Sequence, residues 1–115
     1  MMIKTILPFL LITIALISCD VKKSSVSGKV VNKTTGVGIE NAVVTFSQCK
    51  SNGDNCDEIV IGQVYTQQSG DFIISDKSAS KSKTKWVTVS YNGRKLAQKD
   101  NVGLNDQDLV FQVEP

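Results

Sequence analysis

Histidine is absent from the 115-residue sequence, and this absence limits the chemistry that the chain can perform. Histidine is the commonest general acid or base near neutral pH, and it is the central member of serine-hydrolase triads. Neither arrangement is available to this chain. We therefore expect that the protein is not an enzyme and binds no cofactor, although the sequence leaves a lysine- or aspartate-based site open.

An excess of charge of one sign is also missing, since the formal net charge is only +2. Lys4 is the one basic residue before Cys19, so the chain after it carries twelve basic and eleven acidic side chains. A nucleic-acid-binding surface needs basic residues concentrated on one face. The sequence therefore argues against a nucleic-acid partner.

Long apolar runs are missing except near the start of the chain. Residues 6–17 are apolar apart from Pro8 and Thr13, Lys4 precedes them, and Asp20 begins a polar stretch. A short basic start and an apolar run of about a dozen residues that ends in a small residue are typical of a secretory signal. A bilayer-spanning helix takes about 20 apolar residues. We therefore favour a signal peptide over residues 1–18, with a transmembrane helix as the alternative.

Three cysteines are an odd number for an exported chain. One of them, Cys19, follows Leu16, Ile17 and Ser18. This segment resembles the lipobox of bacterial lipoproteins, in which an aliphatic, a variable and a small residue precede the cysteine. The resemblance implies that the Cys19 thiol carries a diacylglycerol with palmitate-type chains and that a peptidase cleaves between Ser18 and Cys19. An ordinary signal peptide followed by a chance cysteine is the alternative.

Lipidation of Cys19 would make a membrane the first partner of this chain. One buried acyl chain binds a bilayer only marginally, whereas two or more anchor a protein stably. The expected location is the extracytoplasmic side of the bacterial cell envelope, such as the periplasm, on the inner or outer membrane. Asp20 resembles an inner-membrane retention signal that operates in enteric bacteria and not in other lineages. Residues 19–25 comprise the lipidated cysteine and a short linker, residues 20–25, that spans roughly 20 Å when fully extended. This linker keeps the folded part near the membrane.

The other two cysteines, Cys49 and Cys56, flank the turn-rich residues 50–55. Glycine, asparagine and aspartate tolerate left-handed backbone angles, so two strand ends joined by this stretch would bring the cysteines within disulfide reach. An oxidising compartment permits the bond. Two free thiols or half of a metal site are the alternatives, but a zinc site would lack histidine and further cysteine ligands.

Short segments with alternating apolar and polar residues make up the rest of the chain. They predict strands over residues 26–30, 42–47, 59–66, 72–74, 86–91, 94–98 and 109–113. Turn signals separate these segments, among them Asn92-Gly93, a dipeptide favoured in two-residue hairpins. The pattern predicts an all-β fold, an antiparallel β-sandwich of about seven strands with immunoglobulin-like or related architecture, over residues 26–115. The serine- and lysine-rich residues 76–85 are expected to form an exposed, mobile loop.

Several small motifs occur in an order and spacing that resemble a known family. They are Gly28-Lys29-Val30, Thr35-Gly36, residues 38–44 around Ala42, Thr66 through Gly70-Asp71-Phe72, and residues 87–93. Together they resemble the carboxypeptidase regulatory-like domain, a transthyretin-like (prealbumin-like) β-sandwich. The family often ends the last motif in a tyrosine, where this chain has Arg94, and the insertion at residues 48–57 is a second departure.

This resemblance implies an accessory role. Members of the family are usually appended to metallocarboxypeptidases or outer-membrane receptors, or occur in tandem in surface proteins, and they are not the catalytic unit. We therefore expect a membrane-anchored lipoprotein that acts as a non-catalytic binding or scaffold module, with an unknown envelope protein or glycan as its partner. One alternative is a small envelope inhibitor or immunity-type lipoprotein with a protruding Cys49–Cys56 loop. Another is a purely structural envelope protein.

No metal is expected, although one loop carries oxygen ligands of the kind that calcium prefers. These ligands are Asn52, Asp54, Asp57 and Glu58. Their spacing departs from the calcium loop of helix-loop-helix proteins. A hydrophilic loop tip without an ion is the alternative.

Overall fold

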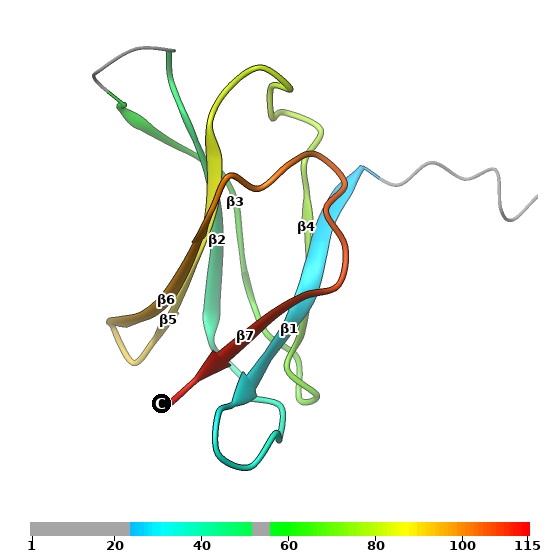
Figure 1. Cartoon of the computed structure of the whole chain (residues 1–115), viewed down its shortest axis with the longest axis vertical. Coiled ribbons are helices and arrows are strands. Elements are labelled where there is room, and N and C mark those ends of the chain that lie inside the picture. Colours follow the sequence, from blue (N-terminus) through cyan, green and yellow to red (C-terminus); the bar gives the residue numbers. More distant parts are fainter. Residues whose placement is uncertain (1–23, 52–55) are drawn as a thin grey trace, which may run out of the picture.

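Seven β-strands form two facing sheets in the computed structural model of the chain, which describes residues 24–51 and 56–115 (Figure 1). The strands are β1 (Ser25–Asn32), β2 (Val43–Cys49), β3 (Glu58–Tyr65), β4 (Asp71–Ser75), β5 (Lys85–Tyr91), β6 (Arg94–Asp100) and β7 (Leu109–Val113). Each predicted segment has a counterpart among them. The β-branched and aromatic residues that dominate these segments favour the extended, pleated backbone.

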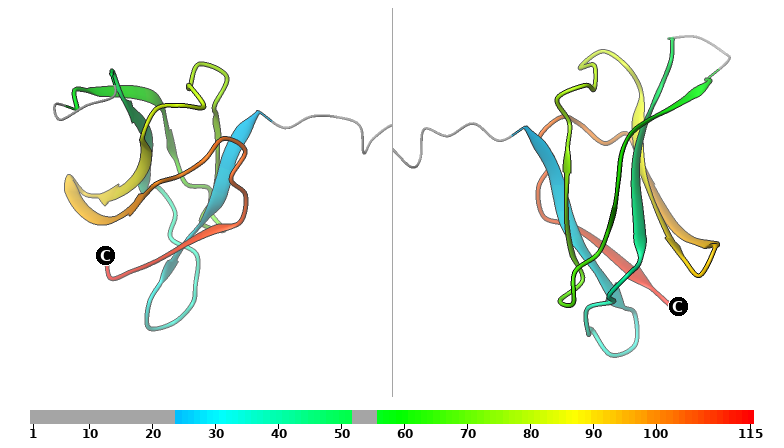
Figure 2. Two further views of the ribbon diagram at one scale, coloured as in Figure 1. Left: turned by 45° about the horizontal axis from the view of Figure 1, so that its top comes forward. Right: turned by 180° about the vertical axis from the view of Figure 1, so that it is seen from behind.

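The first sheet has the order β4-β1-β7, and the second has the order β3-β2-β5-β6. Figure 2 shows the two layers from two further sides. Four of the five neighbouring pairs are antiparallel, and β1 and β7 are parallel. The predicted all-β sandwich of seven strands is confirmed. The parallel pair is the departure from a purely antiparallel arrangement, because the last strand lies beside the first one and runs in the same direction.

The core lies between the sheets and is built from alternate residues of the strands. Its largest side chains include Phe46 of β2, Phe72 of β4 and Phe111 of β7, and the rings of the last two have centroids 6.2 Å apart. Burial of each such side chain stabilises the fold by roughly 1.5–3 kcal/mol. Strands β4, β5 and β7 alternate strictly between more and less buried positions for most of their length, as the period-two pattern predicts.

A buried threonine holds the β1–β2 connection against the end of β3. Thr66 is 2% exposed, and its hydroxyl donates a hydrogen bond to the carbonyl oxygen of Ile39 and accepts one from the Ala42 amide at 2.9 Å. The backbone of Thr66 also pairs with Ala42 and Asn41. Buried backbone groups need partners, so this one side chain satisfies two groups of a connection that lies outside both sheets.

Three predicted turns contain the left-handed backbone that their residues favour. Gly36 and Gly70 have φ angles of 74° and 88°. Asn92 and Gly93 have φ angles of 52° and 78° and connect β5 to β6, as a type I′ hairpin requires. The prediction of a hairpin at this dipeptide is therefore confirmed.

The stretch 76–85 is only partly the exposed loop that its composition predicts. Its end residues, Asp76 and Lys85, are buried. The carboxylate of Asp76 accepts a hydrogen bond from the Asn105 amide at 2.7 Å. The Lys85 ammonium donates to carbonyl oxygens of the loop itself, those of Ser80, Lys81 and Lys83. A buried ammonium is costly without such partners, so the loop backbone is organised around this side chain.

Candidate functional site

The predicted disulfide between Cys49 and Cys56 is present, with the two Cα atoms 4.9 Å apart. Cys49 is the last residue of β2, and Cys56 comes just before β3. The Lys50 amide donates a hydrogen bond to the Asp57 carbonyl oxygen at 2.8 Å. The disulfide therefore links β2 to the start of β3 at one end of the sandwich, the end at which these strands lie in Figure 1.

Only two of the four candidate calcium ligands, Asp57 and Glu58, belong to the described part of the chain. Asn52 and Asp54 lie outside the described residues. The Glu58 carboxylate accepts a hydrogen bond from the buried Ser47 hydroxyl at 2.6 Å. Within residues 24–51 and 56–115, no group of three or more acidic or cysteine side chains could hold a metal ion. Glu58 thus has a structural partner on the neighbouring strand.

The lipidation candidate also lies beyond the described part of the chain. This applies to Cys19, to the cleavage position after Ser18 and to Asp20. The first described residue is Ser24, whose carbonyl oxygen accepts a hydrogen bond from the Asp76 amide at 2.8 Å. In the portion that the structure describes, no helix is long and apolar enough to cross a membrane.

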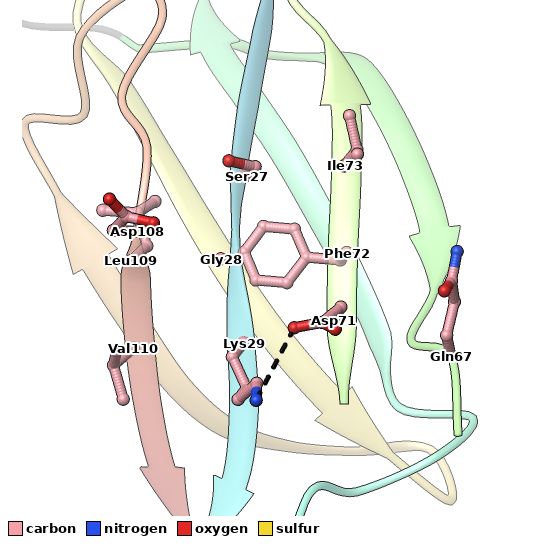
Figure 3. A pocket seen from close by; sticks show the side chains of 10 residues that line it. All are labelled: Ser27, Gly28, Lys29, Gln67, Asp71, Phe72, Ile73, Asp108, Leu109 and Val110. Atoms are coloured by element: carbon pink, nitrogen blue, oxygen red, sulfur yellow. Dashed lines mark ion pairs between the residues drawn. The ribbon is translucent and has the colours of Figure 1, made fainter. Parts of the chain in front are cut away.

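A hollow of about 480 Å³ lies on the three-stranded sheet (Figure 3). Its lining comes from β1, β4 and β7 and from residues that adjoin β4 and β7. The lining residues are Ser27, Gly28, Lys29, Gln67, Asp71, Phe72, Ile73, Asp108, Leu109 and Val110. Five of these residues occupy outward positions of their strands, which alternate with the core residues: Ser27, Lys29, Asp71, Ile73 and Val110.

Strand register brings the outward side chains together. Lys29 in the central strand lies opposite Asp71 of β4 and Val110 of β7. The Lys29 Nζ atom is 3.9 Å from a carboxylate oxygen of Asp71. Two residue pairs further along, Ile73 lies opposite Ser27. Ile73 and Val110 are 66% and 62% exposed, so two aliphatic side chains flank an ion pair on an open surface.

Strands β1 and β7 approach closely at Gly28, one of the residues that line the hollow. A Cβ atom at Gly28 would collide with the backbone and side chain of Leu109. Glycine is therefore needed where the two strands come together. The ring of Phe72 lies beside Gly28, between β4 and β1 (Figure 3), and is buried. Core packing thus supports this surface from below.

The polar groups of the lining include one hydroxyl and one exposed ion pair. The Ser27 hydroxyl donates its hydrogen bond to the amide oxygen of Gln107 at 2.8 Å, which is no base, so this serine is not activated. The side chains of Lys29 and Asp71 are 47% and 52% exposed. An ion pair this exposed contributes about 0–1 kcal/mol to stability, so both charges are available to a ligand. Asp108 adds a second carboxylate to the lining.

Sequence reasoning missed this site, because its residues come from three segments whose adjacency no local pattern reveals. The available signal was the aliphatic character of Ile73 and Val110 at positions where alternation predicts polar residues. No protein-family model matches the chain, and no curated protein gives a significant match. The resemblance of the chain to a known family therefore rests on its sequence motifs alone.

Proposed function

We propose that this protein is a lipid-anchored lipoprotein of the bacterial cell envelope, whose β-sandwich binds a partner protein and catalyses no reaction. The observation that carries the proposal is the Cys49–Cys56 disulfide, which uses two of the three cysteines. The third is Cys19, which follows the apolar run and the lipobox-like residues 16–18. A disulfide also fits the oxidising conditions outside the cytoplasm.

The proposed family, the carboxypeptidase regulatory-like domain, is supported by the roles of its motif residues. Thr66 ties the end of β3 to the β1–β2 connection. Gly70 has a positive φ angle, and Phe72 lies in the core. Three motif residues thus have three separate structural reasons to be where they are. Since domains of this family are accessory modules, the assignment favours recognition over catalysis.

The hollow supports a protein partner more than a glycan. Exposed aliphatic side chains beside polar groups are common at the surfaces through which proteins associate. Ile73 and Val110 provide the aliphatic part, and Lys29 with Asp71 provides the polar part. Sugar rings usually stack on exposed aromatic faces, and the aromatic ring of this lining, that of Phe72, is buried.

Mass spectrometry of the native product tests the anchor. The expected product begins at Cys19 and carries the mass of a diacylglycerol, with or without a further acyl chain on its amino group. The physical reason is that two or more chains are needed for stable attachment. A polypeptide that is intact from Met1 and carries no fatty acid would overturn the proposal.

Site-specific photo-crosslinking in intact cells tests the recognition surface. A photoreactive residue at Ile73 or Val110 of the full chain should give discrete adducts with an envelope protein. The matched control is Val37, which is 65% exposed and therefore as accessible, but lies in the turn after β1. A probe at Lys50, beside the disulfide, tests the inhibitor alternative. Adducts at Lys50 with none at Ile73 or Val110 would contradict recognition through the hollow.

A further inference from the structure

The described chain begins beside the lysine-rich stretch. The hydrogen bond from the Asp76 amide to the Ser24 carbonyl oxygen places Ser24, the N-terminal entry, next to the start of the lysine-rich stretch 76–85. Figure 1 shows the entry and this stretch at the same end of the sandwich as the end of β2, where Cys49 forms the disulfide. The opposite end carries the β1–β2 connection and the β5–β6 hairpin (Figure 1).

Three lysines of this stretch reach the surface. Lys77 and Lys81 are exposed, and Lys83 is half-buried with its Nζ atom 3.1 Å from the Lys50 carbonyl oxygen. The two other charged residues of the stretch, Asp76 and Lys85, are buried and hydrogen-bonded internally. The stretch therefore presents three cations and no carboxylate of its own to solvent.

Acidic side chains near this end belong to other elements, and several of them accept hydrogen bonds. Glu58 accepts a hydrogen bond from Ser47, Asp106 accepts one from the Gly103 amide, and Asp100 accepts one from the Gln98 side chain. Asp57, beside the disulfide, is exposed. The three lysines thus lie together on one stretch, whereas the carboxylates at this end are dispersed over other elements.

We infer that Lys77, Lys81 and Lys83 contact the anionic headgroups of the membrane that holds the acyl chains, an inference that rests on the proposed lipidation of Cys19. The chain from Cys19 to Ser24 reaches about 17 Å when fully extended. Such a tether keeps this end of the sandwich within roughly two Debye lengths of the bilayer at physiological salt. The contact orients the sandwich with its lysine-rich end toward the lipid.

The expected size of the effect follows from the number of lysines. A lysine near an anionic leaflet strengthens membrane contact about fivefold, so three strengthen it on the order of 100-fold at low salt. At about 1 M salt the Debye length is only ~3 Å, and the contact should be lost. The acyl anchor does not depend on charge and should persist under the same conditions.

Energy transfer from Trp86 to dansylated headgroups measures this contact. Trp86 is the single tryptophan of the chain and follows Lys85 at the start of β5, at the lysine-rich end. The full-length lipidated protein is placed in phosphatidylcholine vesicles with or without phosphatidylglycerol. We expect higher transfer in the anionic vesicles, which falls to the neutral-vesicle value when salt is raised.

Two variants with equal charge changes locate the contact. K77Q/K81Q/K83Q should reduce transfer in anionic vesicles to the neutral-vesicle value. K33Q/R94Q/K95Q removes three cations at the opposite end and should leave transfer unchanged. K77Q/K81Q keeps the hydrogen bond from Lys83 to Lys50. Its contact with the anionic membrane should still be weakened roughly 25-fold, because two lysines are removed.

The outcomes separate the orientation from the anchor. Equal transfer in neutral and anionic vesicles, or an equal loss in both triple variants, would show that these lysines do not contact the membrane. Flotation with the vesicles at high salt reports the acyl anchor alone. Protein that fails to float would refute the lipidation itself, and the inference with it.

Discussion

Replacing Gly70 by alanine is expected to lower the free energy of unfolding by about 2–5 kcal/mol. The φ angle of Gly70 is 88°, a conformation that costs a residue with a side chain about 1–2 kcal/mol. A Cβ atom would also collide with the backbone carbonyl oxygen of Val30 and come within 3.0 Å of Gly38 and Ile39. Because these are backbone atoms, strands must shift to make room, and forcing extra atoms into a packed region typically costs 1–3 kcal/mol more.

Gly36→Ala is the matched control for this prediction. Gly36 has a similar φ angle of 74°, but a Cβ atom there meets nothing within 4 Å. Only the conformational cost of about 1–2 kcal/mol should appear. Urea titration measures both variants, with the slope of the unfolding free energy as a check that the unfolding remains two-state. Equal losses in the two variants would mean that the close approach around Gly70 has no energetic consequence.

The double variant Cys49→Ala/Cys56→Ala is expected to lose about 2–3 kcal/mol of stability. In the chain-entropy model, a disulfide restricts the unfolded chain, and the loop closed here is short, since the cysteines are 7 positions apart. Cys49 is buried at the end of β2, so alanine also removes some packing there. Urea unfolding of the full chain under oxidising conditions measures the loss.

Reduction of the unmodified chain provides the control for the disulfide. Dithiothreitol should destabilise the natural sequence by a similar amount and leave the double variant unchanged, because the variant has no bond to reduce. The local hydrogen bond from Lys50 to Asp57 remains available in both proteins. Destabilisation of the variant by the reductant, or a loss below about 0.5 kcal/mol, would contradict the assigned role of the bond.

Local patterns predicted most of the elements, for reasons that particular residues illustrate. In β5, Val87 and Val89 alternate with Trp86, Thr88 and Ser90, and the first two are fully buried. Asn92-Gly93 adopts the predicted hairpin because both residues accept positive φ angles. Such signals depend on a few neighbouring residues, so they survive in the folded protein.

The β2 strand shows where local patterns fail. Alternation predicts that Ser47 points outward and that a polar loop begins at Gln48. Both residues are instead buried. Ser47 donates a hydrogen bond to Glu58, and the Gln48 side-chain oxygen accepts one from the Ser80 amide. These partners lie 11 and 32 positions away along the chain. Polar side chains can be buried when hydrogen-bonded, and no short-range pattern reveals such partners.

By itself, the sequence determined the all-β class, the strand segments, the tight turns and the cysteine pair, because each depends on the conformational preferences and spacing of residues close together in the chain. Only the tertiary structure decided that β7 lies parallel to β1, that Ile73, Lys29 and Val110 share one hollow, and that the lysine-rich stretch lies beside the chain entry. The physical reason is that these contacts join distant segments. They depend on how the two sheets bury their apolar faces against each other, and this packing exists only when the whole core has formed.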